Sequence, residues 1–149
     1  MDLIPGRPHV ASPYRALLSF LEERVVLSDI DPAYYHALAM LLSVLFLYAQ
    51  TPLQKVVIIG VVLLTDWLDG ATARRYGQVQ RSGYITDVAI DRASEALIFS
   101  GEVATVPGQI FFLLWMVNSL LTFYSVHSNK HVSLPLRFLY IIVLVLCPG

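Results

Sequence analysis

Charged residues and cysteine are scarce in this 149-residue chain. Only 14% of the residues are charged, against about 25% in an average soluble domain, whereas 56% are hydrophobic. A surface with so few charges suits lipid rather than water, so the composition predicts an all-α, polytopic membrane helix bundle. The net charge of −1 gives no attraction to a polyanion, and we expect no nucleic-acid partner. The single cysteine, Cys147, excludes an intrachain disulfide framework and a cysteine-based zinc site.

Apolar stretches separated by short polar turns predict five membrane spans. They cover residues 33–49, 53–68, 84–106, 110–126 and 134–147. The fourteen residues of the last stretch rise only about 21 Å as a helix, against about 30 Å of hydrocarbon, so we expect a C-terminus that is truncated or unusually short.

The N-terminal part has a different pattern. Residues 12–27 carry apolar side chains at helical spacing with charged residues between them, which predicts an amphipathic helix on the membrane surface. The chain is therefore divided into an N-terminal segment, residues 1–31, and a transmembrane domain, residues 32–149.

Basic residues in the short loops predict the orientation of the bundle. If the N-terminus is cytoplasmic, seven basic residues lie inside and Lys55 lies outside. The seven are Arg7, Arg15, Arg24, Arg74, Arg75, Arg81 and Lys130. This orientation places the loop at residues 74–83, and the acidic residues beside it, on the cytoplasmic face of the cell membrane.

Four aspartates lie next to this loop. The free energy of inserting a carboxylate at the centre of a membrane helix is unfavourable by at least about 2.5 kcal/mol. Asp66 and Asp69 are three residues apart near the end of one predicted helix, and Asp87 and Asp91 are four apart on the next. Each pair therefore shares a helix face, and the two faces can meet if the antiparallel helices are neighbours.

Four carboxylates on facing helices suit hard divalent cations such as Mg²⁺ or Mn²⁺, and a pair of such ions can promote displacement at phosphorus. The alternative is that the aspartates are solvated or form structural ion pairs with Arg74, Arg75 and Arg92. The neighbouring residues favour the ligand-binding interpretation. Gly70 and Ala73 have small side chains that leave room for a ligand beside Asp69. The guanidinium group of Arg74 is a forked hydrogen-bond donor suited to phosphate.

The spacing of these residues resembles the signature of the CDP-alcohol phosphatidyltransferase family. The matching positions are Asp66-x-x-Asp69-Gly70-x-x-Ala73-Arg74, then eight residues, then Gly83-x-x-x-Asp87-x-x-x-Asp91. The resemblance implies a membrane enzyme of six spans, usually a homodimer, that transfers a phosphate-bearing alcohol from a CDP-linked donor such as CDP-diacylglycerol to an acceptor hydroxyl and releases CMP.

The resemblance also implies roles for individual residues. Asp66, Asp69, Asp87 and Asp91 resemble the ligands of two Mg²⁺ or Mn²⁺ ions, and Asp91 also resembles the general base that takes the acceptor's proton. The donor-binding set that the family implies is Asp66, Asp69, Gly70, Ala73, Arg74, Gln80 and Gly83. Arg137 and Lys130 are weaker candidates for binding the acceptor.

Two segments depart from the family pattern. Before the first span, many relatives have a Pro-Asn-x-x-Thr-like element, and this chain has Pro32, Ala33 and His36 at those positions. After the fourth span, the basic run typical of relatives that use a polyol phosphate is replaced by a segment with Lys130 and Arg137. These departures leave the acceptor open.

Three polar residues lie deeper in the predicted spans, where each needs a hydrogen-bond or ion-pair partner. Glu95 continues the helix face of Asp87 and Asp91 by one turn. Its carboxylate could orient Arg92, orient a metal ligand, or make a hydrogen bond that only packs the helices together. We expect Glu102 to face the bundle interior and Asn118 to make an interhelical hydrogen bond.

Two other functions are compatible with the sequence. One is a membrane prenyltransferase that binds a prenyl diphosphate through metal-bound aspartates, for which Asp87 and Asp91 suffice but the glycine pattern is not expected. The other is a cation carrier or an inactive remnant, although all four aspartates are intact.

Overall fold

The computed structural model describes residues 24, 30–76, 81–128 and 134–147, and these residues form helices without any strand. The helices are α2 (Pro32–Phe46), α3 (Pro52–Arg75), α4 (Arg81–Ser100), α5 (Val106–Ser128) and α6 (Leu136–Leu146). The prediction of an all-helical fold is confirmed for these residues. The amphipathic helix expected at residues 12–27 lies outside the described residues, apart from Arg24.

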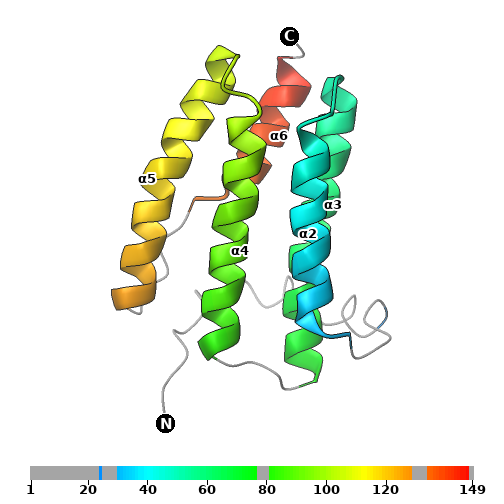
Figure 1. The fold of residues 1–149 in the computed structure, drawn as a ribbon, viewed down its shortest axis with the longest axis vertical. Helices are drawn as coiled ribbons and strands as arrows, with labels where there is room; N and C mark the ends of the chain where they lie inside the picture. Colours follow the sequence, from blue (N-terminus) through cyan, green and yellow to red (C-terminus); the bar gives the residue numbers. More distant parts are fainter. Residues whose placement is uncertain (1–23, 25–29, 77–80, 129–133, 148–149) are drawn as a thin grey trace.

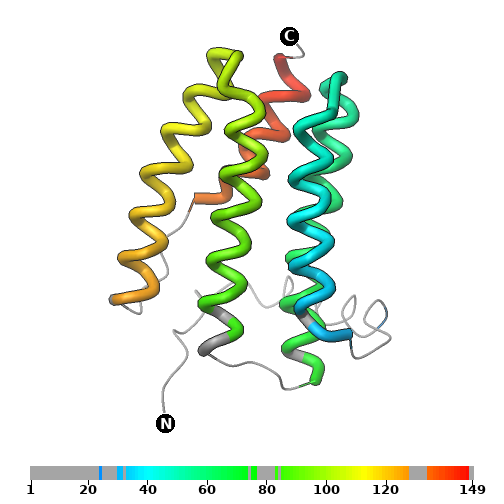
Figure 2. The backbone as a smooth tube through the Cα atoms, in the orientation of Figure 1, coloured from blue at the N-terminus to red at the C-terminus, as the bar shows by residue number. Residues whose placement is uncertain are grey.

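Consecutive helices run in opposite directions, so the described part of the chain is an up-and-down bundle (Figure 1). α2 packs against both α3 and α4, α4 packs against α5, and α6 packs against α3 and α5. Figure 2 shows that α6 begins near the middle of the bundle and runs toward the end where α2 finishes and α3 begins. The first turn of α6 therefore lies at the depth of the central part of α3 and α4.

Local signals fix where the first two helices begin. The Asp31 carboxylate accepts a hydrogen bond from the Ala33 amide at 2.8 Å, and Pro32 occupies the first helical position. Thr51 and Gln54 form a capping box at the start of α3. These caps place the helix starts within one residue of the expected ones.

Two helix ends differ from the expectation. α3 continues to Arg75, seven residues beyond residue 68, because Ala71 and Thr72 are buried against the bundle, and this packing outweighs the cost of about 1 kcal/mol for a helical glycine at Gly70. α4 ends at Ser100 instead of residue 106, and a turn follows in which the Thr105 hydroxyl accepts a hydrogen bond from the Gly108 amide.

The bundle core is apolar, and polar side chains are buried beside it. Phe99, Phe111 and Tyr140 form an aromatic cluster with ring centroids 4.8 to 5.6 Å apart. Asn118, which is fully buried, accepts a hydrogen bond from the Leu134 amide at 2.7 Å and donates to the Leu134 carbonyl at 3.1 Å. This confirms the expected hydrogen bond from α5, and it fixes the chain just before α6.

Large apolar side chains cover the outside of the bundle. Phe123 is 78% exposed and Leu120 is 73% exposed, and many other Leu, Val and Ile residues of all the helices face outward. Two segments, Pro52–Ala73 and Val106–His127, are long and apolar enough to cross a bilayer, whereas Ala33–Phe46 and Leu136–Leu146 are apolar but shorter. These features are consistent with a membrane bundle, and the count of five spans stays a prediction.

Candidate active site

The four aspartates come from two helices that were expected to pack directly against each other. Instead, α2 packs against both α3 and α4, and the α3–α4 pair is not among the main helix contacts of the described bundle. Asp66 and Asp69 on α3 therefore face Asp87 and Asp91 on α4 across side chains from α2 and α6. Each of these side chains, His36 and Arg137, contacts one aspartate of each helix.

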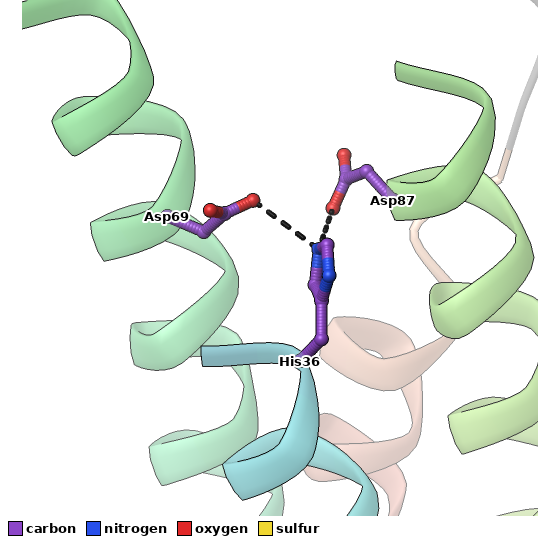
Figure 3. A group of neighbouring side chains, drawn as sticks. All are labelled: His36, Asp69 and Asp87. Carbon is purple, nitrogen blue, oxygen red and sulfur yellow. Dashed lines mark ion pairs between the residues drawn. The ribbon is translucent and has the colours of Figure 1, made fainter. Parts of the chain in front are cut away.

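His36, in the second turn of α2, lies between Asp69 and Asp87 (Figure 3). Its Nε2 atom is 3.4 Å from Asp69 Oδ2 and 3.7 Å from Asp87 Oδ1. Asp69 is only 7% exposed, and its Oδ1 atom has no hydrogen-bond partner within the described structure. The His36 Nε2 atom is likewise buried without a hydrogen bond to a described residue.

Arg137, in the first turn of α6, pairs with the other two aspartates. It is 4% exposed, its Nη1 atom contacts Asp66 Oδ2, and its Nη2 atom lies 3.0 Å from Asp91 Oδ1. Nη2 also donates to the Asp91 backbone carbonyl at 2.9 Å, and Nε lies 3.9 Å from Glu95 Oε1. A guanidinium group thus neutralises part of the carboxylate charge on this side of the site.

Glu95 and Arg92 support the site from within α4. Arg92 Nη1 lies 2.9 Å from Glu95 Oε2, so of the alternatives considered for Glu95 the contact with Arg92 is present. The Trp115 indole on α5 donates to the Arg92 carbonyl at 3.0 Å, so this part of α4 is also fixed from outside. Glu95 is buried and extends the acidic region by one helical turn beyond Asp91.

The residues expected to bind the donor are only partly described. Gly70 and Ala73 lie in α3 just beyond Asp69 and are partly exposed, and Gly83 is exposed near the start of α4 with open space where a Cβ would be. The backbone of Arg74 continues α3. The side chain of Arg74 and all of Gln80 and Lys130 lie outside the described residues.

The chemistry of the His36, Asp69 and Asp87 group fits a divalent cation. One ligand atom from each residue lies within 4.8 Å of the others, and a positive ion would satisfy the buried Asp69 oxygen. Asp66 and Asp91 fit a cation as well, because the guanidinium of Arg137 already lies between them.

The role of His36 was not predicted from the sequence, where it appears only as a departure from the Thr of the family pattern. Its position four residues after Pro32 places it one helical turn inside α2, level with Asp69 on the antiparallel α3. Arg137 was a weak acceptor candidate in the sequence, and its contact with two of the four aspartates depends on how α6 packs.

Comparison with known proteins identifies the family of the chain. The model of the CDP-alcohol phosphatidyltransferase family matches residues 34–146, which include the five helices except for the first two residues of α2. No curated protein and no solved structure shows a significant match. Members of this family transfer phosphatidyl groups from CDP-alcohols and use divalent metal ions. The chain therefore belongs to the CDP-alcohol phosphatidyltransferase family.

Proposed function

We propose that the protein is a membrane-embedded transferase that moves a phosphatidyl or related phospho-alcohol group from a CDP-linked donor, such as CDP-diacylglycerol, to the hydroxyl of a small polyol or polyol phosphate, in phospholipid biosynthesis. One observation carries the proposal beyond family membership. The aspartates of α3 and α4 are close enough for His36 to contact Asp69 and Asp87, and for Arg137 to contact Asp66 and Asp91.

We propose two Mg²⁺ or Mn²⁺ ions as cofactors, held by Asp66, Asp69, Asp87 and Asp91. When bound, such ions neutralise the negative charge that develops on the diphosphate and on the departing CMP. The carboxylates of α3 and α4 position that charge between the middle of the bundle and the end that carries the loop between α3 and α4, where the donor's diphosphate would lie. Gly70, Ala73, Arg74, Gln80 and Gly83 are the proposed contacts of the CDP part.

Asp91 is the proposed general base. Its carboxylate accepts the proton of the acceptor hydroxyl, and the acceptor oxygen forms a bond to the phosphorus that bears the donor's alcohol. The bond between that phosphorus and the bridging oxygen breaks, and CMP leaves with this oxygen on its phosphate. Asp91 then releases the proton to water.

Arg137 and Lys130 are the proposed acceptor contacts. A guanidinium group binds phosphate in a bidentate manner, and Arg137 lies next to Asp91, so it can hold a phosphate-bearing acceptor beside the base. In this proposal Arg137 exchanges the carboxylates of Asp66 and Asp91 for the acceptor's phosphate. The two aspartates are then available for a cation.

The remaining parts of the proposal concern the setting of the enzyme. The exposed apolar side chains support a multi-pass location in the cell membrane, and the basic loop residues support an active site on the cytoplasmic face. A homodimer is expected from the family resemblance.

The test is CMP release by the purified protein in detergent with CDP-diacylglycerol, Mg²⁺ or Mn²⁺, and a panel of acceptors that includes polyols and polyol phosphates. The proposal predicts release that requires both an acceptor and a divalent ion. Absence of release with every acceptor and ion, from protein shown to be folded, would contradict it.

A further inference from the structure

His36 places an imidazole nitrogen among carboxylates that would otherwise offer only oxygen. We propose that His36 is itself a metal ligand, and that it shifts the ion preference of the Asp69/Asp87 site from Mg²⁺ toward Mn²⁺. This inference rests on the proposed metal dependence of the enzyme. It adds a ligand and a selectivity that the four-aspartate pattern does not contain.

The distances suit a common ion. Ligand atoms about 2.1 Å from one metal lie about 3.0 Å apart at octahedral angles and about 3.4 Å apart at tetrahedral angles. The His36 Nε2 atom is 3.4 Å from Asp69 Oδ2 and 3.7 Å from Asp87 Oδ1. The two distances from His36 are thus within a few tenths of an ångström of those expected for ligands of one ion, and the three ligand atoms all lie within 4.8 Å of one another.

The hydrogen bonding of the group also points to a cation. The Nε2 atom of His36 and the Oδ1 atom of Asp69 are both buried, and neither has a hydrogen bond within the described part of the chain. A buried polar atom without a partner is unfavourable. A divalent ion between the three residues would give both atoms a partner.

The Asp69/Asp87 pair faces a different side chain from the Asp66/Asp91 pair. Asp66 and Asp91 face the guanidinium of Arg137, whereas Asp69 and Asp87 face an imidazole, which is a ligand when neutral. Two carboxylates and a neutral imidazole carry a charge of −2, which a single divalent ion balances.

The imidazole determines the selectivity. Mg²⁺ prefers oxygen ligands and keeps its water, whereas transition metals accept imidazole readily. Mn²⁺ should therefore gain more from His36 than Mg²⁺ does. Replacing His36 by Thr, the residue of the family pattern at this position, should remove the advantage of Mn²⁺ and leave the oxygen ligands in place.

The experiment is pulsed electron paramagnetic resonance of Mn²⁺ bound to the full chain in detergent, which detects a directly coordinated ¹⁴N nucleus. Coupling is expected in the unaltered protein and in His127→Asn, whose histidine is exposed at the end of α5. The coupling should be lost in His36→Thr. Competition titrations should show that the ratio of Mg²⁺ to Mn²⁺ dissociation constants falls at least about tenfold in that variant.

A second variant covers the case in which His36→Thr does not fold. The chain has four histidines, so a His9→Asn, His127→Asn, His131→Asn triple variant retains only His36. Coupling that persists in the triple variant supports the inference. Bound Mn²⁺ without nitrogen coupling in the unaltered protein, or coupling that survives in folded His36→Thr, would overturn it.

These readouts are independent of CMP release. Nitrogen coupling without any transfer activity would support the metal site and contradict the proposed function. Transfer activity with Mn²⁺ bound only through oxygen would support the proposed function and contradict the role of His36 as a metal ligand.

Discussion

Arg137 determines much of the electrostatics of the candidate site, because it lies within 4.0 Å of carboxylate oxygens from three residues. Two of these, Asp66 and Asp91, are proposed metal ligands, and the third is the buried Glu95. A buried charge that loses its partner usually destabilises a protein by 3–5 kcal/mol, because desolvation of the remaining charge is no longer compensated.

Replacing this arginine therefore tests whether the acidic group needs a cation. Arg137→Ala should lower the free energy of unfolding by about 3 kcal/mol when no divalent ion is present. Mn²⁺ should restore part of that loss, since an ion can then bind between Asp66 and Asp91. Thermal unfolding in detergent measures both effects. An unchanged midpoint, or a loss that Mn²⁺ does not reduce, would contradict this account of Arg137.

Asp91 is the residue at which the proposed proton transfer takes place. Asp91→Asn keeps the size of the side chain but removes its ability to accept a proton, so CMP release should fall at least about 100-fold. Binding of CDP-diacylglycerol should change much less, because the other aspartates remain. Asp31→Asn is the control, since asparagine caps a helix as well as aspartate does. Activity close to that of the unaltered enzyme in Asp91→Asn would exclude Asp91 as the base.

The sequence predicted the identity of the acidic residues better than their partners. The spacing of the aspartates indicates shared helix faces, because helical periodicity is a local property. The positions of His36 and Arg137 depend on the packing of α2 and α6, which no local pattern specifies. Their contacts became visible only in the structure.

At the level of whole helices, a second buried charge cluster joins three elements far from the aspartates. Lys55 on α3 lies 2.6 Å from Glu102 in the turn after α4, and the Tyr140 hydroxyl on α6 donates to Glu102 at 2.9 Å. The expectation that Glu102 faces the bundle interior is thus confirmed, since the residue is 5% exposed. The cluster fixes the end of the bundle opposite the loop between α3 and α4.

A double-mutant cycle measures how strongly this cluster joins the helices. Lys55→Met and Glu102→Gln should each destabilise the bundle, because each leaves the other residue unpaired. The double variant should be more stable than the sum of the two losses implies, by about 1–3 kcal/mol. Unfolding of the four proteins in detergent gives this coupling, with Ser119→Ala as a control whose hydroxyl donates to the Trp115 carbonyl within α5. Strictly additive losses would show that the pair does not couple the helices.

Helix positions were predictable from the sequence because apolar runs and capping residues are local signals. α2, α5 and α6 have ends within four residues of the expected ones. The continuation of α3 beyond Asp69, through Gly70 to Arg75, was not predicted, because burial of Ala71 and Thr72 is a property of the bundle. The arrangement of α2 against both α3 and α4 was missed for the same reason.

For the whole molecule, the proposed orientation places the aspartates in the cytoplasmic half of a membrane bundle. Gln50 and Tyr76 flank α3 at opposite ends, and both are exposed. The 24 residues of α3 rise about 36 Å, which is enough to cross the hydrocarbon of a bilayer.

Cysteine labelling tests this orientation. In a Cys147→Ser background, a membrane-impermeant maleimide should label Gln50→Cys in intact cells and Tyr76→Cys only after the membrane is opened. The expectation follows from the excess of basic residues near the Tyr76 end. The reverse labelling pattern would place the site on the outer face, and labelling of both positions in intact cells would contradict a spanning α3.

The most direct test of the whole account is the divalent-ion dependence of CMP release from CDP-diacylglycerol across the acceptor panel. The account predicts that at least one polyol or polyol phosphate supports release, that chelation of divalent ions stops it, and that added Mn²⁺ or Mg²⁺ restores it. Release that continues after complete removal of divalent ions, or no release under any of these conditions, would contradict the account.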